Sequence, residues 1–148
     1  LVQGENADLT VIDDPDCTRL PWLIEQHTEH MELGGYLSAS GALLEALHRH
    51  SNPTTRLHLL VAESAGEPVS GVLLARHGNT ATFLVGWTGS KGRDLRATHL
   101  LLWQAVEKLK TSGIAWFDLG GINAKAPGVE RFKRGLGGEE TILVGGYL

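Results

Sequence analysis

The chain has 148 residues, of which 42% are hydrophobic and 20% charged, with a formal net charge of −4 at pH 7. A single domain of this length buries roughly two-thirds of the surface that its unfolded chain exposes, so it needs no disulfide or structural metal. With Cys17 as its only cysteine, the chain cannot form an internal disulfide. No Cys/His cluster has zinc-ligand spacing, so we expect no metal site. Without a signal-peptide pattern or an apolar run of about 20 residues, we expect no membrane span and a cytoplasmic location.

Charge is distributed unevenly along the chain. Residues 1–50 contain two basic and nine acidic side chains, a local charge of −7, whereas residues 91–134 contain nine basic and four acidic ones, a local +5. Seven of the 13 basic residues lie within 91–96 and 125–134. An acidic chain with one basic region suits a polyanionic ligand.

The first part of the chain predicts one short strand and two helices. Alternation over residues 8–12 indicates the strand, and the turn cluster at 13–16 ends it. Apolar side chains at three- and four-residue steps then predict a helix over residues 18–33. After a glycine break, Ser38 or Ser40 can cap a second helix. His27 and His30, three residues apart on the first helix, could suggest a metal site. One helix supplies at most two ligands, so we interpret them instead as part of a mixed polar helix face.

The middle of the chain predicts an antiparallel meander. Three β-rich runs at 57–63, 69–76 and 80–86 are separated by turn residues. Their almost continuous apolar character indicates that both faces of the sheet are covered.

The last third predicts a crossover. A long helix over residues 97–112 precedes a strand over 114–119, so this strand should run parallel to the last strand of the meander. We expect Trp103 and Trp116 in the core because they fall on apolar helix and strand patterns. A short helix at 129–134 and a strand at 141–144 complete the predicted set.

This order of elements resembles the core of the GNAT acyltransferases. The resemblance implies an α+β, three-layer GNAT acyl-CoA N-acyltransferase-like fold, in which a mixed, mostly antiparallel sheet has helices on both faces. It also implies that the sheet splits between two neighbouring strands and so leaves a cleft for the acyl donor.

Three motifs sharpen the resemblance. The segment 95–103 reads LRATHLLLW, 117–123 reads FDLGGIN, and 127–139 reads PGVERFKRGLGGE. Together they resemble the C-terminal GNAT-like domain of the FemABX family, aminoacyl-tRNA-dependent transferases that build peptidoglycan interpeptide bridges. The family pattern is D-L-G-G, a variable loop, and then F-K-x-G-x-G-G/A. Because these enzymes have two tandem GNAT-like domains, we expect residues 1–148 to be a single such domain, the C-terminal half of a longer protein.

Lys133 and Asp118 are the candidate catalytic residues. Acyl transfer to an amine develops negative charge on the carbonyl oxygen, and a fixed cation stabilises that charge. Lys133 follows Phe132, which a short helix can bury, and the family resemblance implies that this lysine faces the donor or the oxyanion. Asp118 precedes the loop glycines, and its main expected role is to accept hydrogen bonds that hold the loop.

The other candidate site residues bind substrate or donor. Gly120 and Gly121 let a ligand approach the backbone closely, and Asn123 and His99 are candidates for contacts with the substrate. A second group is cationic and would bind donor phosphates; it consists of Lys91, Arg93, Arg96, Arg131 and Arg134.

The segment before the long helix also bears on the donor. Helix N-termini favour anions, and acetyl-CoA-dependent GNAT enzymes have the pattern R/Q-x-x-G-x-G/A there. Counted from Arg93, the fourth and sixth places are Arg96 and Thr98. This departure does not support coenzyme A as the donor. The FemABX resemblance implies that the basic residues meet phosphates of tRNA or of a nucleotide-linked acceptor.

Three functional hypotheses follow. The first is transfer of an aminoacyl group from aminoacyl-tRNA to an amine of a peptidoglycan precursor or related peptide, with no tightly bound cofactor. The second keeps the fold but takes an acyl-CoA or acyl carrier protein as donor and a small amine as acceptor. The third is a non-catalytic binding half of a two-domain transferase, completed by a second GNAT-like domain or by a second copy of the chain.

Overall fold

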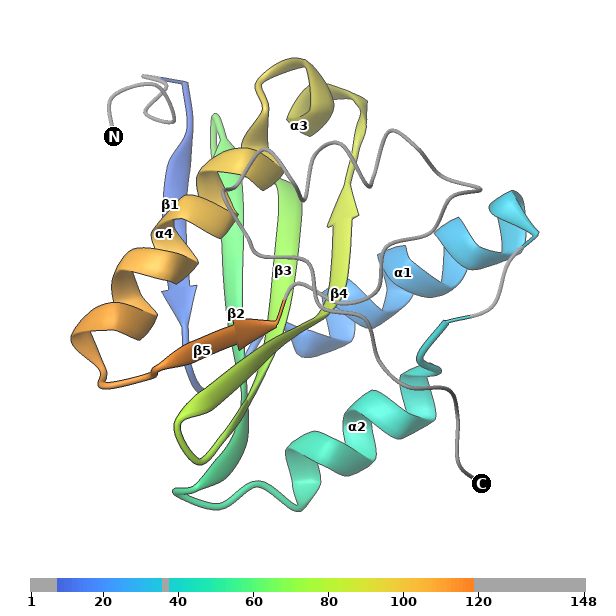
Figure 1. Ribbon diagram of the computed structural model, residues 1–148. Coiled ribbons are helices and arrows are strands. Elements are labelled where there is room, and N and C mark those ends of the chain that lie inside the picture. The colour runs from blue at the N-terminus through green and yellow to red at the C-terminus, as the bar shows by residue number, and fades with distance from the viewer. Residues whose placement is uncertain (1–7, 36–37, 119–148) are drawn as a thin grey trace, which may run out of the picture. The chain divides into compact units, whose positions relative to one another are not determined.

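The computed structural model describes residues 8–35 and 38–118 (Figure 1). The strands are β1 Thr10–Asp14, β2 Thr55–Ser64, β3 Glu67–His77, β4 Thr80–Thr88 and β5 Trp116–Asp118. The helices are α1 Leu20–Gly34, α2 Gly41–Arg49, α3 Ser90–Asp94 and α4 Ala97–Thr111. The predicted helix at 129–134 and strand at 141–144 lie outside the described residues.

The five strands form one sheet in the order β1-β2-β3-β4-β5. Neighbours from β1 to β4 are antiparallel, whereas β5 runs parallel to β4 after the α4 crossover. The predicted meander and the predicted parallel pair are therefore both confirmed. The β2–β3 turn contains Ala65 and Gly66 with φ of 53° and 80°, the two positive values that a tight type I′ hairpin requires.

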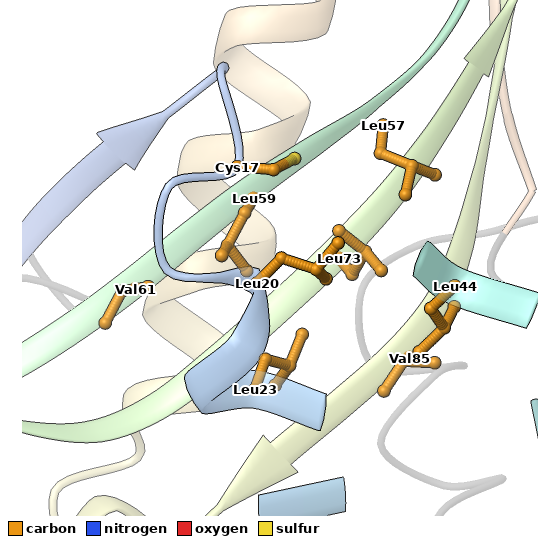
Figure 2. Packing of buried hydrophobic residues seen from close by; sticks show 9 residues of the cluster. All are labelled: Cys17, Leu20, Leu23, Leu44, Leu57, Leu59, Val61, Leu73 and Val85. Carbon is orange, nitrogen blue, oxygen red and sulfur yellow. The ribbon is translucent and has the colours of Figure 1, made fainter. Parts of the chain in front are cut away.

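Helices cover both faces of the sheet (Figure 1). Leu57, Leu59 and Val61 of β2 point into a core to which α1 contributes Leu20 and Leu23 and α2 contributes Leu44 (Figure 2). The alternate residues of β2 point to the other face, where α4 packs against β2, β3 and β4. Both faces of β2 are thus buried, as its continuous apolar sequence predicts.

Local sequence explains where the two early helices begin and end. Ser40 accepts a hydrogen bond from the Leu43 N–H at 3.1 Å and is the N-cap of α2, as predicted. Gly35 ends α1 with a left-handed φ of 65°. His27 is buried, and its Nε2 lies 2.9 Å from the carbonyl oxygen of Ala39. This contact ties α1 to the segment that leads into α2.

The prediction that Trp103 and Trp116 lie in the core is wrong. Their exposed fractions are 42% and 69%. The sheet-facing side of α4 is already filled by smaller side chains such as Leu101 and Ala105, which leaves Trp103 on the outside. The packed pair of tryptophans is instead Trp22 and Trp87, whose rings meet edge to face at a centroid distance of 5.6 Å.

Candidate functional site

The strands β4 and β5 pair only at one end. Residues Thr80–Thr82 of β4 pair with Trp116–Asp118 of β5, whereas β4 continues to Thr88. The register against β3 also shifts, because Leu73 lies opposite Val85 and Leu74 opposite Phe83, which leaves one extra residue in β4. Such a bulge bends the strand. Beyond Thr82, the outer edge of β4 thus has no partner strand within the described part of the chain.

The end of β4 leads directly into α3, which is held close to β3. The N–H of Gly89 donates to the Val69 carbonyl at 3.0 Å. A Cβ atom on Gly92 would lie 2.2 Å from that carbonyl oxygen and 2.6 Å from Thr88 Oγ1, so this position requires glycine. The close approach leaves the side chains of Lys91 and Arg93 exposed on α3. They lie on α3, which directly follows the end of β4 (Figure 1).

Arg96 connects α3 to α4 in a conformation typical of glycine. It is the N-cap residue of α4, with φ 55° and ψ 41°, and its side chain caps no backbone group. The first N–H groups of a helix have no partner within the helix, so an uncapped N-terminus attracts anions. The exposed Arg96 guanidinium adds a full positive charge beside this N-terminus.

Thr98 points into the fold. Its Oγ1 lies 3.1 Å from Oγ of the fully buried Ser70, which in turn donates to the Trp87 carbonyl at 2.9 Å. The two residues that depart from the coenzyme A pattern are therefore both accommodated: Arg96 adopts the left-handed conformation that glycine favours, and Thr98 packs inward. In the described part of the chain, the side chains of Arg96 and Thr98 therefore do not cap the N-terminus of α4.

Asp118 lies at the other end of the free β4 edge. It is exposed at the end of β5 and pairs in register with Thr82. From Thr82 to Thr88 the strand rises about 20 Å. Asp118 and the cations at the α3–α4 junction thus lie at opposite ends of one strand edge, and only an extended donor could contact both.

The structure brings some predicted site residues together and separates others. Lys91, Arg93 and Arg96 gather at the α3–α4 junction, and His99 lies in the first turn of α4. Asp118 is distant from them along β4. The remaining candidates lie outside the described residues; they are Gly120, Gly121, Asn123, Arg131, Lys133 and Arg134.

Sequence reasoning missed α3 and the Ser70–Thr98 contact. A helix of five residues, Ser90–Asp94, is too short to show a helical period in its side chains. The signal that could have revealed it is Gly92, a glycine between two exposed cations where no turn is needed. Nothing in the spacing of Ser70 and Thr98, which are 28 residues apart, indicates their contact.

Other chemistries have little support in the described residues. Burial, with a smaller effect of the Asp14 and Asp16 charges, raises the pKa of the Cys17 thiol to about 12, so this cysteine is not a nucleophile at neutral pH. Residues 8–35 and 38–118 contain no group of three or more His, Cys, Asp or Glu side chains that could hold a metal ion. Among the described helices, none is long and apolar enough to cross a membrane.

A split mixed sheet, a bulged strand and a basic helix junction together define an N-acyltransferase fold. Residues 3–134 match the family model described as an acetyltransferase (GNAT) domain, and the chain belongs to this family. It is therefore an enzyme domain of the acyltransferase class. A search of curated proteins found no significant relative.

Solved structures share the fold at low sequence identity. An aminoglycoside acetyltransferase from an uncultured soil metagenomic sample, in complex with sisomicin, matches with a TM-score of 0.67 and 13% identity over 95% of this chain and 96% of its own. The ribosomal-protein-S18-alanine N-acetyltransferase of Escherichia coli matches with a TM-score of 0.64 and 15% identity over 90% and 79%. FemX matches with a TM-score of 0.63 and 14% identity over 82% of this chain but only 46% of its own. These likenesses confirm the predicted α+β GNAT-like fold.

Proposed function

We propose that this domain transfers an aminoacyl group from aminoacyl-tRNA to an amine of a peptidoglycan precursor or a related peptide. The observation that carries the proposal is the edge of β4, which has no partner strand beyond Thr82 among the described residues and leads to a helix N-terminus beside three exposed cations. An unpaired strand edge offers N–H and C=O groups to an extended ligand. The junction offers a positive end for a phosphate, and Lys91, Arg93 and Arg96 add their charges.

The chemistry of transfer requires little from the protein beyond positioning and charge. The acceptor amine attacks the ester carbonyl of the donor, a C–N bond forms and the ester C–O bond breaks. The tRNA hydroxyl leaves with a proton, which the substrate or water transfers. Lys133 stabilises the negative charge that develops on the carbonyl oxygen. The choice of this donor rests on the sequence motifs at 117–123 and 127–139.

A second candidate donor is acyl-CoA or an acyl carrier protein, with a small amine as acceptor. The specific observation in its favour is the α3–α4 junction. Arg96 has a positive φ where the coenzyme A pattern has glycine, and Thr98 is turned inward towards Ser70 where that pattern has a small residue. The Thr98 side chain would therefore not obstruct a pyrophosphate group that binds at the N-terminus of α4.

Binding measurements distinguish the two donors. We expect aminoacyl-tRNA to bind and acetyl-CoA to show no micromolar affinity in a calorimetric titration. The double variant Lys91→Gln/Arg93→Gln should weaken donor binding at least about tenfold, because it removes two phosphate-directed cations. Lys110→Gln, an exposed lysine in the last turn of α4, is the matched control. Micromolar acetyl-CoA binding that the double variant abolishes would replace the tRNA proposal with the second candidate.

Turnover separates catalysis from binding alone. Lys133→Ala should abolish aminoacyl transfer while leaving the unfolding temperature and donor binding of the chain unchanged. Full activity of this variant would contradict the role given to Lys133. If the wild-type chain binds donor without forming product, the domain is the binding half of a larger enzyme, and adding a second GNAT-like domain should restore turnover.

A further inference from the structure

Two arginines face each other at the end of the sheet opposite α3. In the β2–β3 register, Arg56 lies directly opposite Arg76. Residues in such a pair have Cβ atoms about 5 Å apart, and like charges in these positions destabilise a sheet. Arg56 is exposed and Arg76 is half-buried. The fold thus holds two positive charges together at a position where a neutral pair would be more stable.

No acidic side chain in the described residues compensates for this pair. Neither guanidinium has an ion pair or hydrogen bond there, and carboxylates further along β1 and β2 are engaged with other groups. Asp13 contacts His58 and Lys108, and Glu63 contacts Arg19. Burial, and then the charge of Arg56, lower the pKa of the Arg76 guanidinium. Within residues 8–35 and 38–118, Arg76 is therefore a partly desolvated cation without a counter-ion.

The pair lies away from the α3–α4 junction. Leu57 and Leu59 point into the core under α1 and α2, so Arg56 and its partner Arg76 point to the α4 face by strand alternation. Along β3, Val69 contacts α3, whereas Arg76 lies seven residues further on, about 23 Å away by strand rise. The two arginines thus cannot serve the donor phosphate that the junction would bind.

We propose that Arg56 and Arg76 form a second anion site, which binds a phosphate group. Two guanidinium groups held on adjacent strands can each donate paired N–H groups to the same tetrahedral anion. A bound phosphate would supply the missing counter-charge and convert the repulsion between the arginines into a bridge. The chemistry is the same for a small phosphate compound and for a phosphodiester of RNA.

The test uses inorganic pyrophosphate and a short RNA oligonucleotide as probes. All variants are made in the Lys91→Gln/Arg93→Gln background, which removes two of the cations at the α3–α4 junction. We compare Arg56→Gln and Arg76→Gln with Arg49→Gln, an exposed arginine at the end of α2. Affinity is measured by calorimetry, and the unfolding temperature is measured with and without probe at matched ionic strength.

The expected result has two parts with opposite signs. Without probe, Arg56→Gln should unfold at the same or a higher temperature than its background, because the repulsion is removed. With probe, both substitutions should weaken binding at least about tenfold, whereas Arg49→Gln should not. Loss of pyrophosphate binding assigns a small phosphate ligand, and loss of RNA binding alone assigns a phosphodiester. Equal affinity of all variants for both probes would overturn the proposal, whatever donor the α3–α4 junction binds.

Discussion

At Arg96 the backbone and the side chain have opposing requirements. Its φ of 55° costs about 1 kcal/mol for a residue with a Cβ atom, while its guanidinium adds charge beside the α4 N-terminus. We expect Arg96→Gly to raise the free energy of unfolding by up to about 1 kcal/mol and to weaken donor binding. Urea denaturation and donor titration measure the two effects. A variant that binds donor as tightly as the wild type would show that the guanidinium has no contact with it.

Ala65 provides a matched control for Arg96. It has nearly the same backbone conformation, with φ 53°, in the β2–β3 turn. Ala65→Gly should give a similar gain in stability because it relieves the same conformational strain. It should leave donor binding unchanged, because the turn carries no group of the candidate site.

The element α3 depends on a single small residue. A Cβ atom on Gly92 would overlap the Val69 carbonyl oxygen, which is backbone and cannot rotate away. Gly92→Ala should therefore displace α3, lower the free energy of unfolding by about 1–3 kcal/mol and weaken donor binding. Ser90→Ala, on the exposed first residue of α3, should change neither quantity appreciably. Normal stability and donor binding in Gly92→Ala would mean that α3 lies further from β3 than described.

The edge strand β1 is tied to the rest of the fold through Asp13. Its carboxylate bonds to His58 on β2 and lies 2.9 Å from Lys108 Nζ on α4. Burial raises the pKa of Asp13, but the hydrogen bonds and charges of His58 and Lys108 outweigh this effect and lower it below its usual 3.8. The stabilisation is therefore complete above about pH 4 and is lost as the pH falls through the lower, folded-state pKa.

Asp13→Asn should thus destabilise the protein at pH 6 by up to about 1 kcal/mol, because His58 and Lys108 lose their carboxylate partner while solvent screens the partly exposed Lys108 pair. The difference from the wild type should shrink below pH 4, where the wild-type carboxylate also becomes protonated. Urea denaturation at pH 6 and pH 3 measures this, with the exposed Asp16→Asn as control. A difference that is the same at both pH values would exclude the ionised carboxylate as its source.

The elements differ in how well the sequence predicted them. The three meander strands and α4 were predictable because each has a long apolar run or period, and their boundaries differ from the prediction by one or two residues at most ends. The bulge in β4 was not predictable, since it depends on the register against β3 at Leu73 and Leu74. Trp103 was misplaced because an apolar side chain on a helix does not reveal which face meets the sheet. The sequence predicted that the cations of the α3–α4 junction form one phosphate-binding group. Their distance of about 20 Å from Asp118 follows only from the pairing of β4 with β5.

For the whole molecule, the division between an acidic first third and a basic last third predicts how binding responds to salt. The net charge of −4 should repel a polyanion, whereas the local +5 of residues 91–134 should attract it. If tRNA is the donor and contacts Lys91, Arg93 and Arg96 through its phosphates, the logarithm of the affinity should fall with the logarithm of the salt concentration. Three contacts correspond to a slope of about −2 to −3.

The slope identifies the contribution of each cation. Arg93→Gln should weaken RNA binding and reduce the magnitude of the slope by about 1, because one fewer counter-ion is released. Lys110→Gln, at the other end of α4, should leave the slope unchanged. Filter binding of aminoacyl-tRNA measures the slope for both variants. The salt concentration is varied from about 50 to about 200 mM, a range that includes physiological ionic strength. A slope that Arg93→Gln leaves unaltered would show that the RNA binds elsewhere on the molecule. The acyl group would then approach the edge of β4 from a different direction.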